Sequence, residues 1–397
     1  MKYIVLIIDG AAGWPLPEYG AKTCLELART PNLDGLAAGG RLGLTRTVPK
    51  GMEPSSACAC MSLLGYDPAV YYRGRAAIEA VSMGVPVAGD EAIFRCNLVA
   101  IKDGKMGSYA AGHISSAESH QLIESLNERL GSREVQFYPG VGYRHLLRLK
   151  GHPETLAAVC TPPHDIPDRP VAGYEPHGAG SGFLVELMRQ AETVLKGHPV
   201  NVIREKQGKI LATDIWPFWG SAQVPPMPSF KEAYGLSAAL TSGVDLLRGL
   251  GLMAGMKILE IDGVTDGLDN DWTAQVEGAL GSLEGNDLVV IHVEAPDEAG
   301  HAGSVADKVK AIEQIDSHML GRIRRYKSDG LRLLVAADHP TPIAARTHVA
   351  EPVPCLLWGE GFGTCGAARF TEAEAGRTGI LIEPGCNIMR SLVNGHA

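Results

Sequence analysis

Residues 287–301 read DLVVIHVEAPDEAGH, and this stretch decides the fold class. The run LVVIHV is apolar almost throughout and does not alternate with polar residues, which is typical of a strand covered by helices on both faces. The segment EAPDEAGH follows at once and places Asp297 and His301 four residues apart, about one turn of a helix. We therefore expect a buried strand that ends at a pair of polar side chains.

Similar apolar runs recur along the chain. Residues 3–8 form a run that ends at Asp9, and residues 331–337 form another that ends at Asp338 and His339. Two further runs have this character, at residues 257–261 and 353–358. Three stretches have the apolar spacing of helices, at residues 182–195, 236–252 and 305–325. This order predicts an α/β fold with a central, mostly parallel sheet flanked by helices.

Residues 92–169 have a different pattern of apolar and polar residues. Alternation at residues 94–101 predicts a half-exposed strand, and residues 116–130 predict an amphipathic helix. Further strands are expected at residues 134–137, 143–149 and 156–160. We predict that residues 92–169 form a smaller α+β domain, inserted into a core made of residues 1–91 and 170–397.

Composition and charge exclude several classes of partner. The 36 Lys and Arg against 45 Asp and Glu give a formal charge of −9, and 6% of the residues are aromatic. This balance, without a basic block, argues against nucleic acid. No apolar run approaches the ~20 residues that span a bilayer, and the run at residues 3–8 is too short for a secretion signal. We expect a cytoplasmic protein whose eight cysteines are reduced.

Acidic and imidazole side chains follow three of the predicted strands. Because the carboxyl ends of neighbouring parallel strands meet at one edge of a sheet, these side chains converge if the strands are neighbours. Carboxylate oxygen and imidazole nitrogen suit zinc, manganese or iron, and two ions ~3.5–4 Å apart can clamp a transferring phosphoryl group. Each residue alone has a plain alternative as a turn, a cap or a surface ion pair. The candidate donors are Asp9, Asp297, His301, Asp338, His339 and His348.

A nucleophile for such a site is available in residues 51–68, GMEPSSACACMSLLGYDP. Ser55 or Ser56 precedes a small apolar run that predicts a helix, and free backbone N–H groups at a helix N-terminus favour a phosphate. A bound cation would lower the pKa of such a hydroxyl and activate it. The alternative is that the serine only caps the helix, and the spacing does not choose between these interpretations.

Longer segments match a known enzyme family. In chain order they are IVLIIDGAAGWPLPEYGAKTCLELARTPNLDGLA, MSLLGYDP, YYRGRAAIEA, FRCNLV, AGHISS, YRHLL, PPHDI, IWPFWG, MPSFKEAYG, HVEAPDEAGH, KVKAIEQID and ADHPTPIAARTHVAEPVP. Through these segments nearly the whole chain resembles the archaeal-type branch of the cofactor-independent (2,3-bisphosphoglycerate-independent) phosphoglycerate mutases, in the alkaline phosphatase superfamily. The resemblance implies an alkaline-phosphatase-like, metal-binding core with an inserted domain that handles the substrate.

The resemblance also implies a chemistry and a ligand set. The reaction would interconvert 3-phosphoglycerate and 2-phosphoglycerate, in glycolysis and gluconeogenesis, by metal-dependent phosphoryl transfer through a phosphoserine at Ser56. Two divalent ions (Mn, Zn, Mg or Co) would serve as cofactors, without 2,3-bisphosphoglycerate. One ion would be held by Asp9, Ser56, Asp338 and His339, and the other by Asp297, His301 and His348.

Groups that bind a small phosphorylated metabolite are implied in the same way. Guanidinium groups match both carboxylate and phosphate, and imidazole or carboxyl groups can orient the substrate or move protons. The candidates are His113, Arg73, Arg75, Arg95, Arg144, His164, Asp165 and Arg169. For each of them a solvated arginine or a core histidine is the competing interpretation.

Several positions depart from the family pattern. An expected Asp is Ala57, an expected Asn is Cys60, an expected Lys is Gln275, and an expected Gly-Gln-Gly has Ser221 at its centre. The proposed metal ligands all persist, so metal-assisted phosphoryl chemistry is better supported than the substrate. The alternatives are a related phosphotransferase or phosphatase on another small phosphate ester, such as a homoserine-kinase-like enzyme, and a non-catalytic metal-binding descendant.

Overall fold

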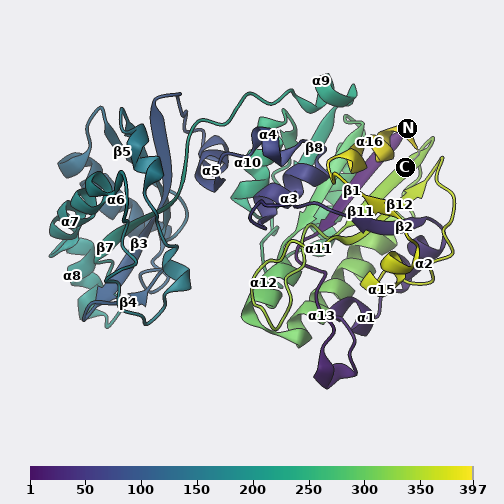
Figure 1. Cartoon of the computed structure of the whole chain (residues 1–397), viewed down its shortest axis with the longest axis horizontal. Coiled ribbons are helices and arrows are strands. Elements are labelled where there is room, and N and C mark those ends of the chain that lie inside the picture. Colours follow the sequence, from purple (N-terminus) through teal and green to yellow (C-terminus); the bar gives the residue numbers. More distant parts are fainter. Residues whose placement is uncertain (396–397) are drawn as a thin grey trace. The chain divides into compact units, whose positions relative to one another are not determined.

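The computed structural model describes residues 1–395, which divide into two compact units (Figure 1). The first unit consists of residues 1–72 and 226–395, and the second of Arg73–Pro225. The second unit therefore extends beyond the predicted insertion, residues 92–169, at both ends.

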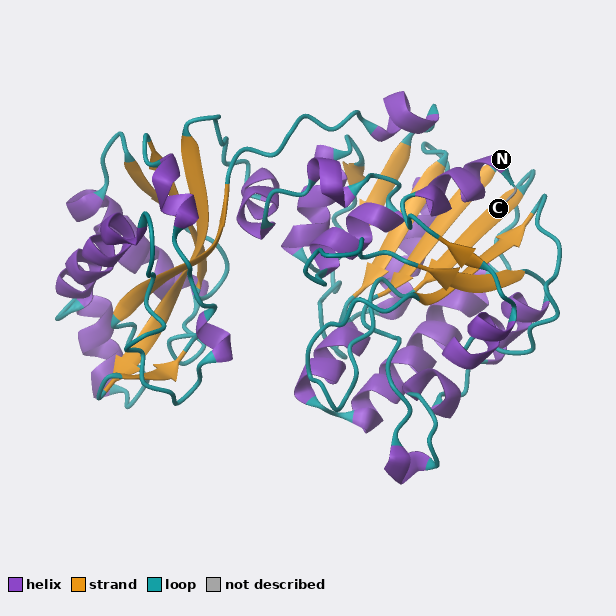
Figure 2. Ribbon diagram, in the orientation of Figure 1, coloured by secondary structure: helices purple, strands orange, loops and turns teal. Residues whose placement is uncertain are grey.

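The first unit is built on a sheet flanked by helices, as Figure 2 shows. Among the described residues it has eight strands in the order β13-β2-β12-β11-β1-β10-β8-β9. Neighbouring strands are parallel except where β12 is a partner, so the predicted mostly parallel sheet is confirmed. The bounds are β1 Lys2–Ile8, β2 Arg41–Thr45, β8 Ala238–Thr241, β9 Lys257–Ile258, β10 Leu288–Val293, β11 Leu331–Ala336, β12 Val353–Gly359 and β13 Leu381–Ile382.

Helices cover both faces of this sheet, which explains why its central strands are continuously apolar. Ile4, Leu6 and Ile8 of β1 share one buried cluster with side chains of α2, α11 and α13. Val5 and Ile7 are equally buried but point to the other face, because side chains alternate along a strand. On that face α3 contacts α10 and α16, which in turn contact β8 and β11.

The helices of the first unit are mostly short. Their bounds are η1 Pro17–Tyr19, α1 Cys24–Leu27, α2 Pro31–Ala38, α3 Ser56–Leu63, α4 Pro68–Tyr71, α9 Phe230–Tyr234, α10 Asp245–Met253, α11 Trp272–Ser282, α12 Ala295–Ala302, α13 Val305–Gln314, the π-helical η4 Ile315–Leu320, α14 Gly321–Ile323, α15 Glu372–Arg377 and α16 Asn387–Asn394. Over residues 1–395 no helix combines the length and the apolar character that crossing a membrane requires.

The second unit contains an antiparallel sheet centred on β3, which pairs with β4, β6 and β7. Phe94 and Leu147 face a cluster shared with α6 and α7, whereas Ile93 and Leu146 face α5 on the other side. The strands are β3 Glu91–Lys102, β4 Lys105–Ser108, β5 Val135–Tyr138, β6 Arg144–Lys150 and β7 Asp214–Ser221. The helices are α5 Arg75–Ser82, α6 Ser116–Leu130, η2 Pro153–Ala157, η3 Pro163–Asp165, α7 Ser181–Leu195 and α8 Pro199–Lys206.

The wider bounds of this unit follow from the packing of its ends. β7 pairs with β3 over most of its length, and its Trp216 and Phe218 are buried in the same cluster as Phe94. On the opposite face Ala76 and Ala80 of α5 pack against the sheet. β7 and α5, which lie outside residues 92–169, therefore belong to this sheet and its packing. The predicted domain boundaries at residues 91 and 170 are too narrow for this unit.

Two sequence predictions of secondary structure are wrong. The helix predicted at residues 236–252 begins only at Asp245, because Ala238–Thr241 forms β8 and pairs with β10. The strand predicted at residues 156–160 is also absent from the described structure, and Pro153–Ala157 forms a 3₁₀-helix instead. In that turn the Thr155 hydroxyl donates to the carbonyl oxygen of His152 at 2.6 Å.

A buried lysine joins the loops that follow β1 and β11. Lys308 of α13 is fully buried, and its Nζ donates to the carbonyl oxygens of Ala12, at 3.1 Å, and Thr341, at 2.7 Å. Burial lowers the pKa of Lys308, and nearby carboxylates oppose this shift. The lysine thus holds together two strand ends that carry predicted metal ligands.

Replacing Lys308 by methionine should lower the free energy of unfolding by about 2–4 kcal/mol, because two buried carbonyl oxygens lose their donor. Urea unfolding of the two proteins measures the difference. Lys310→Met, at an exposed position of the same helix, is the control and should change stability by no more than about 0.5 kcal/mol. Equal stability of the two variants would contradict the role assigned to Lys308.

Candidate metal centre

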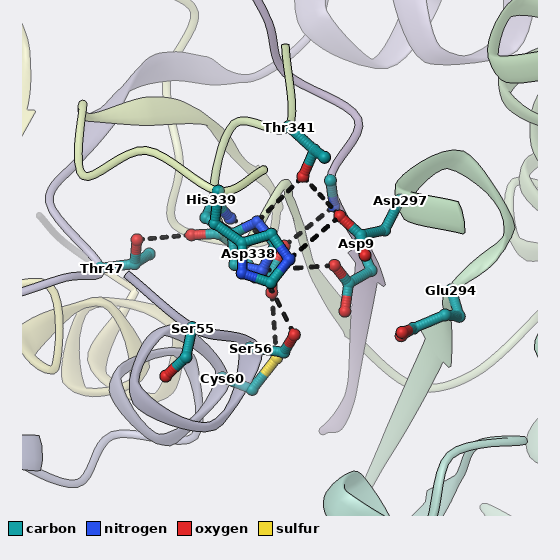
Figure 3. Close-up of polar contacts among 12 residues, drawn as sticks. Asp9, Thr47, Ser55, Ser56, Cys60, Glu294, Asp297, Asp338, His339 and Thr341 are labelled. Carbon is teal, nitrogen blue, oxygen red and sulfur yellow. Dashed lines mark hydrogen bonds and ion pairs between the residues drawn. The ribbon is translucent and has the colours of Figure 1, made fainter. Parts of the chain in front are cut away.

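The predicted strand-end residues come together at the carboxyl edge of the first sheet. β1 lies between β10 and β11, and all three strands are parallel. Asp9 follows β1, Asp338 and His339 follow β11, and α12 carries Asp297 and His301 directly after β10. Figure 3 shows Asp9, Asp297, Asp338 and His339 pointing toward one another.

One cluster of donors surrounds the ring of His339. Its Nε2 lies 3.1 Å from Asp338 Oδ2, 3.6 Å from Asp9 Oδ1 and 3.3 Å from Ser56 Oγ. Asp9, Asp338 and His339 are fully buried, and Ser56 is 6% exposed. Carboxylate oxygens and a ring nitrogen therefore converge with a hydroxyl at one buried position, which is the donor set of a divalent cation.

A second cluster adjoins the first and combines Asp297, His301 and His348. The two imidazole Nε2 atoms face each other at 2.8 Å, and they lie 3.2 and 3.6 Å from the Asp297 oxygens. His301 Nδ1 lies 3.0 Å from the carbonyl oxygen of Arg346, which can only accept, so Nδ1 carries a proton and Nε2 of the neutral ring has a free lone pair. Two facing nitrogens beside a carboxylate fit a shared cation.

The electrostatics of these clusters also favour cations. Burial and the neighbouring carboxylates raise the pKa of Asp9 well above its usual value, and burial and Asp297 raise that of Glu294 to about 8. Burial opposes ionisation of Asp297, but hydrogen bonds with His301 and His348 hold its pKa well below the usual range. Asp9 Oδ1 and Glu294 Oε2 are buried and have no hydrogen-bond partner among the described residues. Positive charge at this position would satisfy them.

The structure separates the two serines that the sequence left as alternatives. Ser55 is the N-cap of α3, and its hydroxyl accepts a hydrogen bond from the backbone N–H of Cys58. Ser56 is the first residue of the helix, and its hydroxyl is directed to His339. Ser55 therefore has the capping role, and Ser56 is the serine that lies with the metal-ligand candidates.

Four residues beside the cluster were not found from the sequence: His292, Ser242, Thr341 and Glu294. His292 Nε2 lies 2.7 Å from Asp9 Oδ2, and its Nδ1 lies 3.0 Å from Ser242 Oγ. Ser242 accepts from the Val244 backbone N–H, so its own proton is available for Nδ1, and His292 donates to Asp9 through Nε2. Thr341 donates to Asp297, and Glu294 lies at the end of β10. The imidazole inside the apolar run of β10 was the signal for His292.

In the second unit several of the predicted substrate-binding residues lie close together. Glu79 Oε1 accepts from Arg75 Nε at 2.8 Å and from Arg95 Nη1 at 2.6 Å. Arg75 and Arg95 both lie over the ring of Trp219, at 4.7 and 5.8 Å, and the ring of His164 is 5.4 Å from it. The result is a cationic group with an aromatic wall, which can accept a small anion.

The remaining candidates of this unit are arranged less compactly. Arg144 and His113 both contact the ring of Tyr143, at 5.7 and 6.4 Å. Asp165 is exposed and lies 3.9 Å from His164. The other two, Arg73 and Arg169, are also exposed.

Known proteins of similar sequence match this chain over most of its length. Residues 37–201 match the family described as 2,3-bisphosphoglycerate-independent phosphoglycerate mutase. The protein of that name from Methanosarcina acetivorans is 44% identical over 384 residues, which cover 96% of this chain and 96% of the relative. Its counterpart from Methanothrix thermoacetophila is 42% identical over 398 residues and covers 100% of both chains. The chain belongs to this family.

Solved structures share the fold of this chain. The PH0037 protein from Pyrococcus horikoshii is 27% identical, with a TM-score of 0.83 over 100% of this chain and 98% of its own. A cofactor-independent phosphoglycerate mutase from Thermoplasma acidophilum, at 24% identity, has the same fold, with a TM-score of 0.65 over 99% of both chains. The relatives at 44% and 42% identity confirm the family predicted from the sequence.

Of the positions expected to depart from the family pattern, Ser221 lies at the end of β7 in the second unit, and three others lie in the first unit. Gln275 stands for a lysine and is buried, where its amide donates to the carbonyl oxygen of His292 and accepts from Asn270. Ala57 stands for an aspartate and is fully buried. Cys60 stands for an asparagine, and its sulfur is 3.6 Å from Asp338 Oδ2. The buried surroundings of the cluster thus contain a thiol and lack the lysine charge.

Without cations the protein should lose stability as the pH rises from about 7 to about 8.5. The folded state keeps protons on Glu294, whose pKa is raised to about 8, and on His301, whose pKa hydrogen bonding to Asp297 raises to about 9 against the effect of burial. The unfolded chain releases these protons at lower pH, so the free energy of unfolding falls over this range. Melting temperatures in a chelating buffer measure this effect.

Saturating Mn²⁺ should raise the melting temperature, most strongly at the higher pH, because the cation replaces the protons. The matched control is Glu294→Gln, which should flatten the pH dependence in the chelating buffer. A melting temperature that is the same with and without cations at every pH would contradict a metal centre here.

Proposed function

We propose that this protein interconverts 3-phosphoglycerate and 2-phosphoglycerate by passing a phosphoryl group through Ser56. The observation that carries the proposal is the 3.3 Å approach of Ser56 Oγ to His339 Nε2 inside a buried cluster of carboxylates. Relatives at 44% and 42% identity, matched over nearly the whole chain, bear the name of this enzyme. We place the reaction in glycolysis and gluconeogenesis, in the cytoplasm.

The proposed cofactors are two divalent ions, with Mn, Zn, Mg and Co as candidates and no 2,3-bisphosphoglycerate. Asp9 Oδ1, which has no hydrogen-bond partner among the described residues, and the facing nitrogens of His301 and His348 support this part of the proposal. Bound ions would acidify the Ser56 hydroxyl and stabilise charge on the phosphoryl oxygens. One ion would be held by Asp9, Ser56, Asp338 and His339, and the other by Asp297, His301 and His348.

Ser56 is well suited to act as the nucleophile. It opens α3, where backbone N–H groups and the helix dipole favour an incoming phosphate. In the first step Ser56 Oγ loses its proton and bonds to phosphorus, the bond from phosphorus to the 3-oxygen breaks, and the 3-oxygen takes up a proton, which leaves glycerate. In the second step the 2-hydroxyl of glycerate loses its proton and takes the phosphoryl group, so that 2-phosphoglycerate forms and Ser56 recovers its hydroxyl.

Anion binding is the role that we propose for the arginines of the second unit. Arg75 and Arg95 share Glu79, so part of their charge is already balanced, and Nε of Arg95 is buried without a partner among the described residues. A carboxylate or phosphate of the substrate would provide that partner. The full set proposed for this role is His113, Arg73, Arg75, Arg95, Arg144, His164, Asp165 and Arg169.

Ser56→Ala should abolish turnover and the acid-stable phosphoserine, because the acceptor oxygen is removed, while the remaining ligands Asp9, Asp338 and His339 keep the cation bound. Mass spectrometry of protein quenched during turnover with 3-phosphoglycerate measures the modification. Ser55→Ala is the matched control, and it should cost about 1 kcal/mol of stability through loss of the cap but retain the phosphoserine. Normal turnover by Ser56→Ala would overturn the proposal.

Incubation with 3-phosphoglycerate, followed by phosphorus NMR, separates this function from its alternatives. The expected product is 2-phosphoglycerate. Inorganic phosphate in its place would indicate a phosphatase. An unchanged substrate, with Ser56 phosphorylated by a different small phosphate ester, would indicate a related phosphotransferase, which the departures at Ala57 and Gln275 keep open. Cation binding without reaction of any ester would indicate a non-catalytic protein.

A further inference from the structure

Cys60 places a sulfur atom beside the proposed cation site. It follows Ser56 by four residues in α3, so both side chains lie on the same face of the helix. Cys60 is fully buried, and its Sγ lies 3.6 Å from Asp338 Oδ2. Figure 3 shows this sulfur directed at Asp338, next to Ser56. One donor atom each from Asp9, Cys60 and His292 lie within 4.8 Å of one another.

These separations suit ligands of one ion. With a metal–sulfur bond of about 2.3 Å and a metal–oxygen bond of about 2.1 Å, two ligands of one ion that are separated by an angle of about 110° stand about 3.6 Å apart. Cys60 Sγ and Asp338 Oδ2 have this separation. Without a cation the Cys60 thiol donates to Asp338 Oδ2 at this distance; on cation binding the thiol would release that proton to solvent, and sulfur and oxygen would both become ligands without moving apart.

An independent observation points to an ion at this position. Asp9 is fully buried, and its Oδ1 has no hydrogen-bond partner among the described residues, although it lies 3.6 Å from His339 Nε2. The other oxygen, Oδ2, accepts from His292 Nε2 at 2.7 Å. His292 therefore turns one oxygen of Asp9 away and leaves Oδ1 aimed into the cluster, where a cation would be its partner.

We propose that Cys60 Sγ is a further ligand of the cation held by Asp9, Ser56, Asp338 and His339, and that it makes this site select Zn²⁺ or Co²⁺ over Mg²⁺ and Mn²⁺. The inference rests on the cation site of the proposed function. Sulfur ligands favour softer ions, whereas sites built from carboxylate and water suit Mg²⁺ and Mn²⁺. The asparagine expected here would offer oxygen or nitrogen, so the preference is a property of this chain.

A matched control lies two residues away in the same helix. Cys58 is as deeply buried as Cys60, but it packs in an apolar cluster with Val48 and Ala59. Cys58→Ser therefore removes a buried thiol from α3 without touching the proposed ligand set. Cys60→Ser removes the sulfur and keeps the size and the hydrogen-bonding capacity of the side chain.

The decisive measurement is the absorption spectrum of the full chain, stripped of metal and titrated with Co²⁺. We expect visible bands from bound Co²⁺ together with a near-ultraviolet band from sulfur-to-cobalt charge transfer. The near-ultraviolet band should vanish in Cys60→Ser and persist in Cys58→Ser. Visible bands without the near-ultraviolet band, or a band that survives Cys60→Ser, would overturn the proposal and leave the cation site intact. The absence of any Co²⁺ bands would overturn both the sulfur ligand and the cation site of the proposed function.

Competition between metals tests the selectivity. Cys60→Ser and Cys60→Asn should reduce the ratio of Zn²⁺ to Mn²⁺ affinity at least ~10-fold, since even groups that only support a ligand change metal affinity by ~10–100-fold. An unchanged ratio in folded variants would contradict the selectivity. If neither variant folds, X-ray absorption of the zinc-loaded natural protein decides, because a zinc–sulfur distance of about 2.3 Å is expected, and a shell of oxygen and nitrogen alone would refute it.

Discussion

The structure depends on holding like charges close together at the end of a sheet. Asp9, Asp297 and Asp338 are all buried in one region, with Glu294 beside them. Two unit charges ~4 Å apart repel by about 4 kcal/mol at the effective dielectric constant near a protein surface, so this arrangement opposes folding unless positive charge enters it. Extensive apolar burial along β1, β10 and β11 holds the strands in register despite that repulsion.

Hydrogen-bonding groups around the carboxylates orient their side chains. Ser242 donates to His292, His292 donates to Asp9, and the Gln275 amide donates to the His292 carbonyl oxygen. The chain of donors fixes the tautomer of His292 and decides which oxygen of Asp9 faces inward. On the other side Lys308 bonds to the loops after β1 and β11. Residues that hold no ion thus set the geometry of those that could.

How much was predictable from the sequence depends on the range of the interactions involved. β1, β10 and β11 could be predicted because a strand that is buried on both faces has a continuous apolar run. The polar residues after these strands could be found because they mark the points where the apolar runs end. β8 was predicted as helix because four apolar residues fit either structure, and only the pairing with β10 decides. The predicted range of the inserted domain was too narrow for a similar reason, since β7 pairs with β3 although more than a hundred residues separate them in the sequence.

In the candidate site, too, some features could be predicted from the sequence and others required the structure. The ligand candidates could be predicted from residue type and position, but the choice between Ser55 and Ser56 needed the geometry of the first turn of α3. His292 was hidden because a histidine within an apolar strand reads as a core residue, and its partners Asp9 and Ser242 come from other strand ends.

The segment between β11 and β12 adds a thermodynamic consequence. Residues 337–352 contain neither a helix nor a strand, only isolated bridges to residues 11 and 12, yet they supply Asp338, His339 and His348. If these residues hold the proposed ions, the conformational entropy of this segment is coupled to ion binding, because coordination would restrict the same backbone that carries the ligands. Any change that stiffens residues 340–347 in this conformation would tighten ion capture, and one that loosens them would weaken it, without altering a single donor atom.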